Sequence, residues 1–80
     1  MIEIGGIYKH YKGQFYKVLH LARFSEGLEE VVVYQALYKD FDIWVRPKKM
    51  FLESVTQEGA QKPRFEKISI LDIPLNSYTT

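Results

Sequence analysis

The sequence predicts an all-β fold: a small SH3-like barrel of five or six strands, with a 3₁₀ turn before the fifth strand. Three observations predict it. Runs of β-branched and aromatic residues recur along the chain, and Gly, Pro and Asp residues separate them. No stretch has the periodicity of a helix of three turns. A single helical turn before the last barrel strand is typical of SH3-like barrels, so an OB-type barrel is the second choice.

The composition limits the protein to a small domain with few chemical options. Of its 80 residues, 46% are hydrophobic, which is enough for one core and argues against disorder. We expect a single domain over residues 1–70 and a loosely held tail over residues 71–80. The chain has no cysteine, which excludes disulfides and thiolate chemistry. No signal peptide or membrane-spanning run is visible, so a cytoplasmic protein without membrane contact is expected.

Each expected strand begins and ends at residues that break regular structure. Gly13 suits a hairpin loop after the first strand, and the ten-residue second strand is long enough to need a bend or bulge. Polar turns follow at residues 25–30, 39–42 and 57–63. The strands are expected at residues 7–11, 15–24, 31–38, 43–46, 51–56 and 64–70.

The fourth expected strand carries residues of opposite character on its two faces. Alternation predicts that Ile43 and Val45 point into the core, while Trp44 and Arg46 point away from it. Pro47 fixes φ and has no N–H to donate, so it should end the strand and begin the 3₁₀ turn.

With these residues laid out, the chain resembles a family of short bacterial proteins known as domain of unknown function 1653. The resemblance extends from Gly6 to about Glu66. It implies a small cytoplasmic bacterial β protein without a cofactor, and it implies no activity. The residues that carry it are Gly6, Tyr8, His10, Lys12, Gly13, Tyr16, Val18, Ala22, Arg23, Ser25, Glu26, Glu29, Val33, Tyr34, Leu37, Tyr38, Trp44, Val45, Arg46, Pro47, Met50, Phe51, Glu53, Pro63, Arg64 and Phe65.

Catalytic and metal chemistry find little support in the pattern. His10 and His20 could join Glu26 or Glu30 as zinc ligands, but they have no recognisable ligand spacing. Ser25 lies near a histidine without the glycines of a nucleophile elbow, so a turn-capping role is favoured. The carboxylates lie in polar loops, where they are usually solvated. We therefore expect neither a metal site nor an enzyme.

Single-stranded nucleic acid is the alternative partner. Lys48 and Lys49 follow Trp44 and Arg46 closely, and small barrels hold single strands by base stacking and phosphate contact. Against this, the formal net charge is only +1.

The favoured interpretation is a non-enzymatic module that binds a peptide segment or a small anionic ligand. Trp44 would supply stacking area, and the arginine forks would receive a carboxylate or phosphate. The opposing possibility is that Phe65, Tyr78 or the tail covers Trp44 and that Arg46 pairs with Glu53. A monomer or weak homo-oligomer is expected. The candidate ligand-binding residues are Tyr8, Tyr34, Trp44, Arg46 and Arg64, with His20 and Glu29 at the margin.

Overall fold

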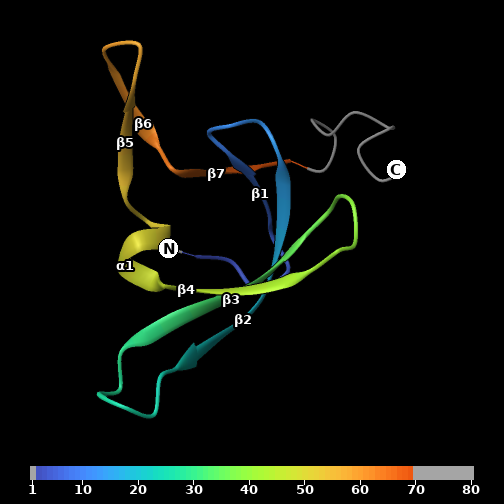
Figure 1. Ribbon diagram of the computed structural model, residues 1–80, viewed down its shortest axis with the longest axis vertical. Helices are drawn as coiled ribbons and strands as arrows, with labels where there is room; N and C mark the ends of the chain where they lie inside the picture. Colours follow the sequence, from blue (N-terminus) through green and yellow to red (C-terminus); the bar gives the residue numbers. More distant parts are fainter. Residues whose placement is uncertain (1, 70–80) are drawn as a thin grey trace.

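The computed structural model describes residues 2–69, and these residues form an all-β fold (Figure 1). One short helical turn, α1 (Lys48–Phe51), lies between the fourth and fifth strands. None of the described helical residues forms a helix that is long and apolar enough to cross a membrane. The strands are β1 (Ile7–His10), β2 (Phe15–Arg23), β3 (Glu30–Ala36), β4 (Ile43–Pro47), β5 (Ser54–Gln57), β6 (Ala60–Pro63) and β7 (Phe65–Ile68).

The strands form two antiparallel sheets rather than a closed barrel. The larger sheet has the order β4-β3-β2-β1-β7, and β5 pairs only with β6 in a hairpin that stands apart from it (Figure 1). Among the described residues the edge strands β4 and β7 are not paired with each other. The all-β prediction is confirmed, but the SH3-like barrel is not. The turn before β5 is α-helical, so the predicted 3₁₀ turn is not confirmed either.

The first half of the chain follows the expected pattern. Gly13 has a φ of 107° and closes the β1–β2 hairpin, where the His10 N–H donates to the Gln14 carbonyl at 2.8 Å. The register of β2 against β3 shifts between Val18 and His20, so the predicted bulge in the long second strand is confirmed. Beyond the bulge, residues 20–23 of β2 are exposed, whereas Val31 and Val32 of β3 opposite them are buried, and the two strands end in a turn at one end of the molecule (Figure 1).

The second half differs from the expected pattern at two elements. Phe51 ends α1 instead of starting a strand, and residues 57–63, expected to be a loop, contain most of the β5–β6 hairpin. The hairpin turn consists of Glu58 and Gly59, both with positive φ, which is the two-residue turn that matches the twist of paired strands. The last expected strand is shorter than predicted, and the expected tail of residues 71–80 lies outside the described residues.

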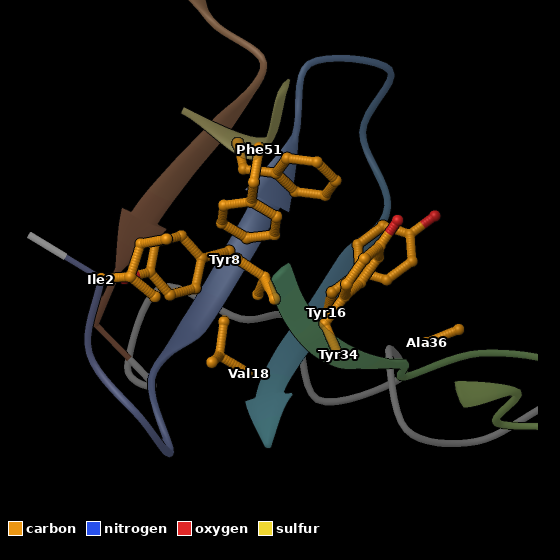
Figure 2. Packing of buried hydrophobic residues seen from close by; sticks show 9 residues of the cluster. Ile2, Tyr8, Tyr16, Val18, Tyr34, Ala36 and Phe51 are labelled. Atoms are coloured by element: carbon orange, nitrogen blue, oxygen red, sulfur yellow. The ribbon is translucent and has the colours of Figure 1, made fainter. Parts of the chain in front are cut away.

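The core is predominantly aromatic (Figure 2). Phe51 from α1 stacks on Phe65 from β7 with the ring centroids 4.1 Å apart and the planes 3° from parallel. Tyr34 and Tyr16 approach Phe65 edge-on, at 5.5 and 5.6 Å. Aromatic pairs prefer these stacked and edge-to-face arrangements. The buried cluster consists of Ile2, Tyr8, Tyr16, Val18, Val32, Tyr34, Ala36, Phe51 and Phe65.

The predicted orientation of β4 is wrong. Ile43 and Val45 are 59% and 63% exposed instead of buried. Trp44 is directly opposite Tyr34 of β3, so it lies on the sheet face that carries the core. Alternation identifies which residues share a face, but the aromatic cluster decides which face is buried.

Candidate functional site

Three tyrosines, Trp44 and Arg46 line an open hollow beside the aromatic core. Its volume is about 230 Å³. Tyr16 comes from β2, Tyr34 from β3 and Tyr38 from the loop that follows β3. Strand β4 supplies Trp44 and Arg46. The antiparallel registers of β2, β3 and β4 bring these side chains together on one face. Figure 2 shows the rings of Tyr16 and Tyr34 side by side with their hydroxyl oxygens at the margin of the core.

The Arg46 guanidinium is held in place without an acidic partner. Its Nε donates to the Tyr34 hydroxyl at 3.2 Å, and its guanidinium carbon lies 5.7 Å from the centre of the Phe65 ring. Within residues 2–69 no carboxylate lies within ion-pair distance of Arg46. Its positive charge is therefore oriented but not neutralised.

A pair of hydroxyl groups forms another part of the hollow. The hydroxyl oxygens of Tyr16 and Tyr38 are 2.7 Å apart and share a hydrogen bond. Burial, followed by the hydrogen bond to Tyr38, raises the pKa of Tyr16 well above its ordinary value. One O–H of the pair is used in their shared hydrogen bond, which leaves the other to donate to an incoming anion.

His10 reports a positive potential beside the hollow. Its ring lies 6.2 Å from that of Tyr16 and 4.9 Å from that of Phe65. The pKa of His10 is lowered, first by burial and then by the positive charges of Arg46, Arg64 and Lys12. The Nδ1 atom of His10 accepts a hydrogen bond from the Lys12 N–H at 3.2 Å, so this nitrogen already has a partner. An anion bound near Arg46 would offset part of this potential.

The structure brings together three of the predicted site residues, Tyr34, Trp44 and Arg46. Arg64 instead forms an ion pair with Glu53 at 2.9 Å, so Glu53 is the partner of Arg64 and not of Arg46. The Nε atom of Arg64 is buried and has no hydrogen-bond partner among residues 2–69.

Tyr8 lies in the core rather than in the hollow. Its ring meets Phe51 edge-on at 5.4 Å, and its hydroxyl accepts a hydrogen bond from the Glu3 N–H at 2.9 Å. Neither residue predicted for the margin lines the hollow: His20 is opposite Val33 of β3, and Glu29 lies in the turn between β2 and β3. Among the described residues, no group of three or more His, Asp or Glu side chains is arranged to hold a metal ion.

The sequence analysis missed Tyr16 and Tyr38 as site residues. They lie in the strands expected at residues 15–24 and 31–38, respectively. Their meeting depends on the cross-strand register, in which Tyr16 is directly opposite Ala36, two residues before Tyr38. Both were among the residues that carried the family resemblance, and that was the available signal.

Trp44 remains half exposed, at 52%. The possibility that Phe65 covers it does not hold, because the Phe65 ring is taken up by Phe51 and by the guanidinium of Arg46. Tyr78 and the tail lie outside the described residues. Trp44 therefore presents stacking area at the rim of the hollow.

A larger depression, of about 520 Å³, lies on the opposite face of the sheet. Lys17 and Gln35 contribute to it, and they alternate with the core-facing Tyr16 and Tyr34. Its Lys67 is already paired with Glu3 at 3.0 Å. The smaller hollow is the better candidate, because it combines an arginine that has no ion pair among residues 2–69 with hydroxyl groups and an exposed indole.

Comparisons with known proteins agree with the resemblance found in the sequence. The family model described as "Protein of unknown function (DUF1653)" matches residues 6–67. A crystal structure of a DUF1653 protein from Bordetella bronchiseptica is 38% identical, covers 80% of this chain and 85% of its own, and superimposes with a TM-score of 0.73. The comparison with curated proteins gave no match. With most of its described strands inside the matched region, the chain belongs to the DUF1653 family.

Proposed function

We propose that this protein is a non-catalytic binding module whose hollow receives the anionic group of a small organic ligand or of a peptide. The observation that carries the proposal is Arg46, a partly buried guanidinium held by Tyr34 and Phe65 with no carboxylate near it among residues 2–69. Arginine presents a planar fork of donors that suits carboxylate and phosphate groups.

The surroundings of Arg46 favour an anion attached to a planar group. The Tyr16–Tyr38 hydroxyl pair supplies a hydrogen-bond donor, and the exposed indole of Trp44 supplies a stacking surface. A hollow of about 230 Å³ is smaller than the pockets that enclose drug-sized ligands, so it suits a single ring or side chain.

Nucleic acid is less well supported by the geometry. Lys48 forms an ion pair with Glu30 at 3.6 Å, and with Lys49 it borders a separate depression that also contains Glu29 and Glu30. The lysines are thus not aligned with Trp44 along one positively charged groove, as a single strand requires.

The proposal can be tested by titrating the protein with phenyl phosphate and benzoate, and with phenol as the matched neutral ring. Trp44 fluorescence and backbone amide shifts would report binding, and the NMR titration of His10 would report charge. We expect the two anions to perturb the hollow and to raise the pKa of His10 towards its ordinary value, because they offset the charge of Arg46. Phenol should bind at least about tenfold more weakly.

Variants identify the site. Arg46→Ala should lower the affinity for phenyl phosphate at least about tenfold, because a charged donor is lost. Arg46→Lys keeps the positive charge but lacks the planar fork, so it separates the contributions of charge and of fork geometry to binding. Lys49→Ala removes an exposed charge outside the hollow and should leave the affinity for phenyl phosphate unchanged. Equal binding by the parent and Arg46→Ala would refute the proposal. The nucleic-acid alternative would be favoured if a single-stranded oligonucleotide bound more tightly than phenyl phosphate. Its affinity should then fall steeply with added salt and in Lys49→Ala.

A further inference from the structure

Within residues 2–69, strand β4 has one edge without a partner strand, and that edge is apolar. Its one partner among the described residues is β3, so its other side offers free backbone groups. Ile43, Trp44 and Val45 are consecutive and all more than half exposed. Proteins normally protect edge strands with charges, bulges or covering segments, since an exposed apolar edge pairs with other strands.

The direction of the free backbone groups follows from the neighbouring hydrogen bonds. The Asp42 carbonyl accepts a bond from the Ala36 N–H at 2.9 Å and therefore points towards β3. Backbone groups alternate in direction along a strand, so those of Ile43, Val45 and Pro47 point outward. Pro47, which lacks an N–H, thus occupies an outward position where the ladder with β3 loses no bond.

We propose that a second copy of this chain pairs antiparallel with β4, with a two-fold axis at Val45. Val45 is the midpoint of the strand Ile43–Pro47, so this register sets every residue of the strand opposite a partner residue, although Pro47 has no N–H to donate across the pair. Val45 of each copy would exchange both backbone hydrogen bonds with the partner's Val45. The Ile43 N–H would donate to the carbonyl of the partner's Pro47.

The side chains favour a second copy in this register. Trp44 would be directly opposite the partner's Arg46, in a pair without backbone hydrogen bonds, where cross-strand side chains are closest. Arg46, the charged residue of β4, would then be opposite an indole ring instead of the partner's arginine. The two-fold axis produces this contact twice. A net charge of +1 on each copy opposes association only weakly.

The paired edge would place the two hollows next to each other, with Trp44 of one copy beside the Arg46 site of the other. The inference rests on the free edge of β4 and not on the proposed function. A contact along five residues is smaller than a standard interface of about 800 Å² per partner, so we expect a reversible dimer that forms at high concentration.

Sedimentation velocity between about 10 µM and about 1 mM would reveal such a dimer. A direct test of the register is Val45→Cys, which is clean because the chain has no cysteine. A hydrogen-bonded antiparallel pair has Cα atoms about 5.5 Å apart, within the range of a disulfide. Under mild oxidation Val45→Cys should cross-link at least about tenfold faster than Leu52→Cys, which is also more than half exposed, at 53% against 63% for Val45, but lies off the edge.

A charge exchange tests the two-fold axis independently. Val45→Lys and Val45→Glu should each be monomeric, because like charges would be directly opposite each other. Mixing the two variants should restore a dimer, and circular dichroism of each would show that both are folded. A monomeric parent at every concentration would overturn the proposal, as would a dimer that persists in Val45→Lys, or one that mixing fails to restore. Phenyl phosphate binding measured at low concentration stays independent of all three outcomes.

Discussion

Replacing Phe51 by alanine should remove a large part of the stability of this fold. Phe51 is 1% exposed, stacks on Phe65 at 4.1 Å and meets Tyr8 and Tyr34 edge-on. Truncating a buried phenylalanine costs about 3–5 kcal/mol, and the three ring contacts favour the upper part of that range. A chain of 80 residues has a free energy of unfolding of about 4–12 kcal/mol, so this loss is large by comparison.

The adjacent residue provides a matched control. Leu52 follows Phe51 directly, at the C-cap of α1, but is 53% exposed. Leu52→Ala should cost about 1 kcal/mol or less, since little of its side chain leaves water. Phe51→Leu should fall between the two, because it keeps apolar volume but loses the stacking.

Urea denaturation followed by circular dichroism would compare the three variants, provided that the dependence on urea keeps the same slope. The burial of Phe51 also accounts for the presence of α1. A four-residue helix has no stability of its own, so the burial of Phe51 must hold it in place. A decrease in the free energy of unfolding of less than about 1.5 kcal/mol in Phe51→Ala, or an equal decrease in Leu52→Ala, would contradict this role of Phe51.

Three further predictions concern ionisation and close packing. The pKa of His10 is lowered in the folded protein by burial and then by nearby cations, Arg46 first. As the pH falls, the unfolded chain therefore binds the proton first, and the free energy of unfolding should decrease below about pH 6.5. The midpoints of urea denaturation should fall less with pH in His10→Gln than in the parent. The pKa of Tyr16 is raised by burial and by the hydrogen bond to Tyr38. The unfolded chain therefore loses the phenolic proton first, and the free energy of unfolding should decrease above about pH 10. Tyr16→Phe should reduce this decrease. Gly6→Ala would place a methyl group 3.0 Å from a backbone carbonyl oxygen and should cost about 1–3 kcal/mol, whereas an unchanged melting temperature would contradict this contact.

Much of the strand arrangement could be predicted because the local signals were strong. Gly13 and the polar residues 39–42 marked turns, and the length of the second strand predicted its bulge. The β5–β6 hairpin was missed because β6 (Ala60–Pro63) is exposed throughout and has no apolar face. Its signal was the Glu58–Gly59 pair, which adopts the positive φ angles of a tight hairpin.

The candidate site was predicted only in part, since it depends on register and on competition for the core. The sequence brought Trp44 and Arg46 together, because they are two residues apart on one strand. It placed them on the wrong side of the sheet, since Ile43 and Val45 are ordinary core residues by composition alone. Phe51 and Phe65, which are 14 positions apart, stack on the other face and decide which side is buried.

The same residues serve the core and the hollow, but through different atoms. The rings of Tyr16 and Tyr34 pack in the buried cluster, while their hydroxyls bind Tyr38 and Arg46. An aromatic core made of tyrosine instead of phenylalanine therefore carries a polar rim, and this rim orients a guanidinium that no carboxylate among residues 2–69 neutralises. Stability alone does not require that polarity, because phenylalanine would fill the same volume. The hydroxyls and Arg46 are thus the features of this fold that packing leaves unexplained and that the proposed anion binding would explain.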